Sequence, residues 1–512
     1  MRLLAAGLAL VVLACLSFLP AVWSGFVSDD FLLLHNLSRS GGLGWAFTHN
    51  DAGEAGAAGH FYRPLWTVWN LGLFKAFGAS TTAFHLGSLL LYAVVVLEVW
   101  ALAATFVDSS RAWIAAAAFA VYPRHGESVS WVSANTDLVA VAAALGALLC
   151  LRARWPLWIR IAAVVMLTAA AALAKEVAFV LPLLALLVLR RRERALPIAM
   201  LLVVGGVFAG RYAAIGGIGG YSGYTWTPLR MIGTAASYAL ASTTPPSVPA
   251  FHYELVFLVP AAIVALAAWR LRVLWKRREE AALRLVGLGL AWFVVAILPL
   301  LSLPVDLNNA NGERNLLLAS VGLALALGGL LPALRAPTTA VAVAAGLAGA
   351  LALSLYNSFD WIEAGRLTQR LVPAAEALAP PGGELMLLSA PESYRTAHVF
   401  TGGDLSGVLG YRGRTDFTTA ICVPVNVWEL RAGEIRFRAN GGAYDGATGW
   451  AAPFDFPVLH SSGGLTGECS YSRLPGGPEP PGLGLRALAG PTPSKQPVVV
   501  AYFDGRDLRR CC

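Results

Sequence analysis

The chain has 512 residues, of which 57% are hydrophobic and 13% are charged. Soluble domains carry roughly 25% charged residues, so this composition excludes an ordinary soluble protein and favours a membrane protein. The formal net charge of +8 does not indicate nucleic-acid binding, because much of the basic excess lies in short loops, as the positive-inside rule expects.

The first apolar run, residues 3–23, contains no charge and is long enough to cross a bilayer. It is long for the h-region of a signal peptide and no clear cleavage site follows, so we expect an uncleaved signal-anchor with a cytoplasmic N-terminus. Asp29 and Asp30 follow directly. Two carboxylates are costly in lipid but not at its surface, so they should lie at the outer end of this span, as an acidic catalytic motif or as a simple polar flank.

Apolar runs recur as far as residue 357 and predict an α-helical polytopic membrane protein of about eleven spans. The third, fifth and sixth runs are short, and residues 65–77 are expected to lie along the interface. With this count the basic clusters at 152–160, 190–194 and 270–278 all lie on the cytoplasmic side. The protein is therefore predicted to lie in the cytoplasmic (inner) membrane, with its other polar clusters outside.

Residues 358–512 form a tail rich in Gly and Pro, with strand-like runs at 384–390, 423–430 and 497–503. They predict a small extracytoplasmic α/β or mostly β domain after a membrane domain that covers residues 1–357. Cys422 and Cys469 could form a disulfide bond there if that compartment is oxidising.

Transfer of a group from a lipid-phosphate donor requires a carboxylate for the acceptor, cations for the leaving phosphate, and a groove for the lipid. Asp29 and Asp30 are the candidate catalytic residues. The candidate substrate-binding residues share the outer side with them: Arg63, His125, Glu127, Lys175, Glu176, Glu313 and Arg314.

These residues also have structural interpretations. Arg63 could be a snorkelling interfacial residue, and the Lys175–Glu176 pair could compensate itself between two spans. The His-x-Glu spacing at 125–127 is compatible with a metal ligand pair, but a metal site normally needs further ligands, so none is predicted. A divalent cation would suit the chemistry without being required. Asn135 and Asp137 are expected to close the loop before the fourth span.

The order of several short motifs resembles the GT-C superfamily of membrane glycosyltransferases, and most closely the transmembrane O-mannosyltransferases that carry tetratricopeptide repeats. The motifs are Phe26-Val27-Ser28-Asp29-Asp30, Tyr62-Arg63-Pro64-Leu65, Phe84-His85-Leu86, Tyr122-Pro123-Arg124-His125-Gly126-Glu127-Ser128-Val129, Asn135-Thr136-Asp137-Leu138, Ala174-Lys175-Glu176 and Glu313-Arg314-Asn315-Leu316. They cover roughly residues 20–325.

The resemblance implies a GT-C fold, a polyprenyl-phosphate sugar donor and inversion at the anomeric carbon. It also implies that Asp29 or Asp30 is the base, and that Arg63, His125, Lys175 and Arg314 lie near the donor phosphate. The chain departs from the pattern because no tetratricopeptide repeats follow the last span. The acceptor therefore stays open between a protein and an envelope glycan or lipid, and mannose is the sugar that the resemblance suggests.

Two other classes compete with a glycosyltransferase. A transporter or flippase would place charges along a pathway and show inverted repeats, and no convincing repetition of the two halves is visible. A non-catalytic envelope scaffold would keep the same topology and bind a partner through its tail.

Overall fold

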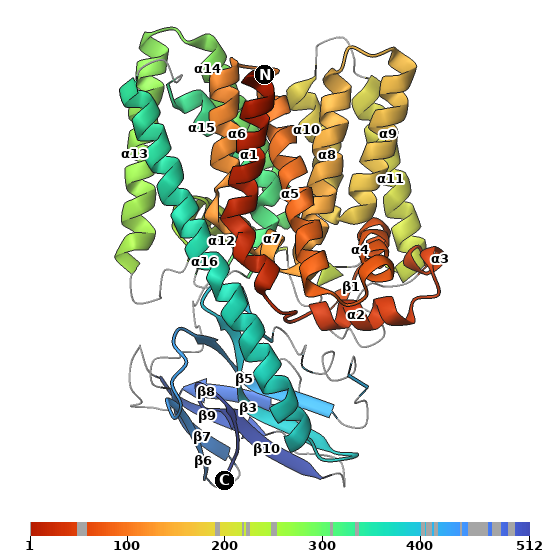
Figure 1. Cartoon of the computed structure of the whole chain (residues 1–512), viewed down its shortest axis with the longest axis vertical. Coiled ribbons are helices and arrows are strands. Elements are labelled where there is room, and N and C mark those ends of the chain that lie inside the picture. The colour runs from red at the N-terminus through yellow and green to blue at the C-terminus, as the bar shows by residue number, and fades with distance from the viewer. Residues whose placement is uncertain are drawn as a thin grey trace.

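The computed structural model describes residues 2–48, 59–189, 195–217, 220–221, 226–246, 253–307, 311–332, 337–400, 405, 412–413, 418–440, 443–448, 469–473, 483–489 and 497–512. In this part of the chain, a bundle of long helices adjoins a smaller domain built from strands (Figure 1). The N-terminus lies at the end of the bundle that is remote from the strands.

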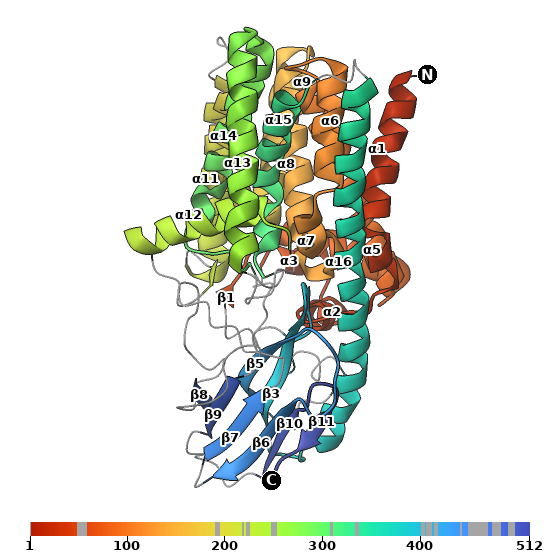
Figure 2. The same cartoon turned by 90° about the vertical axis from the view of Figure 1, so that its left-hand side faces the viewer.

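Eleven helices of the described residues form the bundle (Figures 1 and 2). They are α1 (Arg2–Phe18), α5 (Thr81–Ala103), α6 (Ser109–Ala120), α8 (Thr136–Arg152), α9 (Leu157–Ala174), α10 (Leu181–Val188), α11 (Ala195–Ile215), α13 (Tyr253–Lys276), α14 (Glu280–Ile297), α15 (Leu316–Leu330) and α16 (Pro337–Leu378). Within these ranges, nine helical segments are long and apolar enough to cross a membrane, and α6 and α10 are the shorter two. The prediction of a polytopic helical membrane protein is confirmed.

Glycine allows a close contact between two helices of the bundle. A Cβ atom on Gly289 of α14 would lie 2.3 Å from the carbonyl oxygen of Gly322 of α15. Small residues let helix backbones approach in this way inside a membrane, where no hydrophobic effect drives the helices together.

Short helices gather at the end of the bundle that faces the strands (Figure 1). They are α2 (Asp30–Arg39), α3 (Leu43–Ala46), α4 (Pro64–Phe77), α7 (Gly126–Ser130) and α12 (Pro228–Thr243). Helix α4 occupies the segment that was expected along the interface. Helix α12 begins at a proline and buries Tyr238 and Ala241 against the bundle.

Helix α16 links the bundle to the strands, because its 42 residues continue past residue 357 as far as Leu378. The division of the chain at residue 357 stays a prediction. The strands that follow are β3 (Glu384–Tyr394), β4 (Ala397–His398), β5 (Thr418–Val427), β6 (Ile435–Asn440), β7 (Ala443–Thr448), β8 (Cys469–Arg473), β9 (Leu483–Ala489), β10 (Val498–Phe503) and β11 (Leu508–Arg510).

The described strands of this C-terminal domain form two sheets. One has the order β11-β10-β3-β4, with β5 also paired to β3, and the β10–β3 and β3–β5 pairs are parallel. The other is antiparallel with the order β6-β7-β9-β8. A domain with strands is thus confirmed, and β3, β5 and β10 overlap the three predicted runs. Cys422 is disulfide-bonded, whereas the side chain of Cys469 and the basic cluster at 190–194 lie outside the described residues.

Candidate active site

The acidic pair lies where the turn after the first span leads into α2, with Asp29 before the helix and Asp30 as its first residue. Asp30 is fully buried, and its carboxylate accepts hydrogen bonds from the backbone N–H of Val27 at 3.1 Å and of Ser133 at 2.7 Å. Burial raises the pKa of Asp30 to about 7 although these hydrogen bonds oppose the shift. Asp30 therefore fastens the turn to the segment before α8.

Asp29 lies in a different environment. It occupies the position before α2 and is half-buried, and its side chain makes no capping hydrogen bond to the described residues of that helix. Of the two carboxylates, that of Asp29 is the one that solvent or a ligand can reach.

Lys175 lies at the centre of a buried polar group. Its Nζ donates to Asp137 Oδ2 at 2.5 Å and to Asn315 Oδ1 at 3.3 Å. Burial lowers the pKa of Lys175, the charge of Asp137 opposes this, and the charges of Arg63 and Arg314 lower it further. Three of the predicted cations thus come close enough to influence one another.

Arg63 approaches this group from the residue before α4. Its Nε and Nη2 donate to Glu176 Oε2 at 3.3 and 3.1 Å, and Arg211 of α11 pairs with the other oxygen of the same carboxylate. One carboxylate is shared by two guanidinium groups, so this part of the site has an excess of positive charge.

Arg314 approaches from the other side. Its guanidinium pairs with Glu127 and lies 5.0 Å from the ring centre of Trp131, and its backbone N–H donates to Glu127 Oε2 at 2.5 Å. Burial raises the pKa of Glu127, but the charge of Arg314 and a hydrogen bond from His398 outweigh it, so this pKa lies below its usual range. Glu127 is therefore the counterion that holds Arg314.

Two predicted site residues lie in separate contacts. His125 is fully buried, with Nδ1 2.8 Å from the Tyr92 hydroxyl and Nε2 2.7 Å from the Ser320 hydroxyl. Glu313 pairs with Arg124, and both side chains are at most 2% exposed. These contacts favour structural roles for His125 and Glu313.

The segment 131–137 joins the groups described above. Ser133 donates to the acidic turn, Trp131 lies against the Arg314 guanidinium, and Asp137 is the counterion of the buried lysine. The sequence suggested only that this segment closes a loop. The sequence did carry one signal for the pair of Asp137 and Lys175. Asp137 stands at the start of one span and Lys175 at the end of another, and both ends are expected at the same membrane surface.

Two other contributors carry no such signal. Arg211 lies in the last part of an apolar span, and His398 lies in the C-terminal domain, far along the chain from every predicted motif. Among the described residues, no group of three or more His, Cys, Asp or Glu side chains could hold a metal ion. A divalent cation stays an untested expectation.

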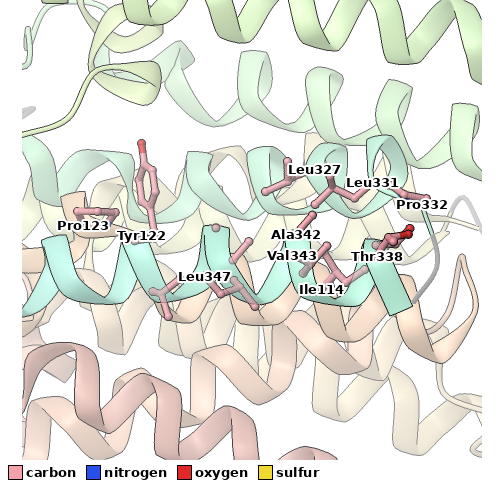
Figure 3. A pocket seen from close by; sticks show the side chains of 15 residues that line it. Ile114, Tyr122, Pro123, Leu327, Leu331, Pro332, Thr338, Ala342, Val343 and Leu347 are labelled. Carbon is pink, nitrogen blue, oxygen red and sulfur yellow. The ribbon is translucent and has the colours of Figure 1, made fainter. Parts of the chain in front are cut away.

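Apolar grooves run along the described part of the bundle. One, of about 970 Å³, lies between α10 and α11 and extends from Phe179 to Leu189 and Leu201, so it begins three residues after Glu176. Another, of about 600 Å³, lies between α6, α15 and α16. Figure 3 shows Tyr122 and Pro123 at one of its ends and Pro332 and Thr338 at the other. Phe179, at the start of the first groove, follows Glu176 by three residues in the chain.

Comparison with known proteins gives similarity to solved structures and to a curated protein. No family model matches the chain. The solved structure of ArnT from Cupriavidus metallidurans bound to undecaprenyl phosphate covers 96% of this chain and 99% of that chain, with 13% sequence identity and a TM-score of 0.41.

The sequence match is with the protein O-mannosyl-transferase Tmtc2 of Drosophila melanogaster, at 34% identity over 183 residues. The aligned part is 32% of this chain and 19% of Tmtc2, so the chain spans about a fifth of the length of that relative. The resemblance that the motifs suggested is confirmed at this level: this chain is a multi-pass membrane protein with sequence similarity to a protein O-mannosyl-transferase.

Proposed function

We propose that the protein is a GT-C-type membrane glycosyltransferase that moves a sugar from a polyprenyl-phosphate donor to a hydroxyl acceptor. The observation that carries the proposal is the convergence of Arg63, Lys175 and Arg314 beside an acidic turn whose Asp29 is accessible. The similarity to an O-mannosyl-transferase supports the same reaction class.

The donor would bind by its two chemically different parts. The cationic cluster attracts the phosphate, since arginine presents a fork of N–H donors that matches phosphate oxygens. The polyprenyl chain would lie in the groove between α10 and α11, because that groove is lined by apolar residues and begins three residues along the chain from Glu176, to which Arg63 and Arg211 bind.

The reaction would be a single inverting displacement. Asp29 accepts the proton of the acceptor hydroxyl, whose oxygen forms a bond to the anomeric carbon as the bond from that carbon to the phosphate oxygen breaks. The electron pair leaves with polyprenyl phosphate, and the cations stabilise the negative charge that develops there. Asp30 would hold the turn in place, because both of its oxygens already accept backbone hydrogen bonds.

We further propose that the reaction takes place on the outer face of the cytoplasmic membrane, with the N-terminus in the cytoplasm and the C-terminal domain outside. The acceptor would be a protein or an envelope glycan or lipid, and the sugar a hexose such as mannose, as the similarity to Tmtc2 suggests.

The direct experiment offers a radiolabelled polyprenyl-phosphate hexose to membranes that contain the protein, and compares the wild type with Arg314→Ala. We expect transfer by the wild type and a loss of about 10²-fold or more in the variant, the size found when one group that stabilises transition-state charge is removed. Equal transfer by both proteins, or transfer no faster than in membranes without the protein, would contradict the proposal.

A further inference from the structure

A segment of the C-terminal domain reaches into the candidate active site. This segment, residues 395–399, consists of the turn after β3, the short strand β4 and Val399. The backbone carbonyl of Val399 accepts a hydrogen bond from Ser28 N–H at 3.0 Å, immediately before the acidic pair. The ring of His398 places Nε2 3.1 Å from Glu127 Oε1.

The position of His398 is fixed by its surroundings. The side chain is 1% exposed and that of Glu127 is fully buried. The imidazole lies 4.6 Å from the ring of Trp131 and 5.9 Å from that of Trp361, measured between ring centres. The His398 ring packs near two indole rings and directs a nitrogen at the buried Glu127 carboxylate. It therefore makes a well-defined contact between the two domains.

The same oxygen of Glu127 receives His398 and the Arg314 guanidinium. We infer that His398 is a positioning residue: it orients the Glu127 carboxylate, which in turn holds the Arg314 guanidinium against Trp131 for the donor phosphate. A buried carboxylate that loses one of its donors keeps the cost of desolvation and can turn away from its remaining partner.

This inference rests on the proposed function, because it assigns Arg314 to the donor phosphate. In addition, the proposed phosphate site contains a residue from outside the membrane domain. The C-terminal domain supplies one member of the hydrogen-bonded chain from His398 to Arg314, and its Val399 also binds the turn that carries Asp29.

The test compares His398→Gln with His398→Asn in the full-length, reconstituted protein. Glutamine places an N–H donor near the position of Nε2, whereas the shorter asparagine does not reach Glu127. We expect His398→Asn to raise the KM for the polyprenyl-phosphate sugar about tenfold or more with a smaller change in kcat, and His398→Gln to stay within about threefold of the wild type.

Thr396→Val is the matched control for the packing of this segment against α16. The Thr396 hydroxyl donates to Asp360 of α16 at 2.9 Å, so this change removes a contact with α16 but leaves the contact with Glu127 intact. A wild-type KM in His398→Asn, or an equal rise in KM in Thr396→Val, would overturn the inference.

A second measurement separates this inference from the proposed function. The Kd for polyprenyl monophosphate should rise by a similar factor in His398→Asn and stay near the wild-type value in His398→Gln. If the wild type transfers no sugar, the proposed function fails, and the two Kd values still decide whether His398 positions an anion site. Equal affinities would reject that role.

Discussion

Asp29 and Asp30 are neighbours in the chain, but the fold gives their carboxylates different environments. Asp30 is enclosed and accepts two backbone hydrogen bonds, whereas Asp29 is half-buried at the start of a helix. A general base must be reachable by the hydroxyl that it deprotonates, so the structure favours Asp29 for that role.

The buried carboxyl predicts a pH dependence of stability. The pKa of Asp30 is about 7 in the folded protein and about 3.9 in an unfolded chain. Because the folded state disfavours the ionised form, the contribution of Asp30 to stability decreases as the pH rises from about 4 to about 7. The difference in thermal midpoint between the wild type and Asp30→Asn should shrink over this range. A difference that stays constant from about pH 4 to pH 8 would contradict this.

A second prediction concerns the buried pair of Arg124 and Glu313. Glu313→Gln leaves the Arg124 charge without its counterion, so we expect a loss of about 3–5 kcal/mol in the free energy of unfolding in detergent. The control is Glu280→Gln, which breaks the exposed pair with Arg284 and should cost at most about 1 kcal/mol. Equal losses would show that burial of the first pair does not matter.

Among the elements, α16 fixes where the acidic turn lies. Gly365 of this helix packs against Gly25, so closely that a Cβ atom on Gly365 would lie 2.5 Å from the Gly25 backbone nitrogen. The glycine pair brings the helix that leads into the C-terminal domain against the segment that leads to Asp29.

Substitution along α16 tests this contact. Gly365→Ala forces the two backbones apart, so we expect a destabilisation of about 1–3 kcal/mol and slower sugar transfer. Gly349→Ala, on the same helix with no described atom within 4 Å of the added Cβ, should keep the wild-type stability and activity. Matching behaviour of the two variants in the unfolding and transfer assays would argue against the contact.

At the scale of the whole molecule, the membrane fold and several of its elements could be predicted from the sequence. A bilayer admits only segments whose backbone hydrogen bonds are made within the protein, so long apolar runs indicate membrane spans. The polytopic fold was therefore predictable, including the short helices α6 and α10. Equally local patterns predicted the strands β3, β5 and β10.

The site was predictable only in part. Arg63, Lys175 and Arg314 were expected on one side of the membrane, and they do converge. His125 and Glu313 were expected on the same side as these cations, but each binds a buried partner outside that group. Which partner a side chain binds depends on packing rather than on spacing in the sequence. His398 could not be foreseen, since its role depends on how the C-terminal domain docks.

The central claim is that Asp29 is the base of a lipid-phosphate-dependent sugar transfer. The most direct measurement is the rate of label transfer from a polyprenyl-phosphate hexose by the reconstituted wild type and Asp29→Asn, together with the affinity of both for polyprenyl monophosphate. We predict a rate loss of about 10²-fold or more at unchanged affinity, as expected when a general base is removed. Transfer by Asp29→Asn at the wild-type rate would contradict the account.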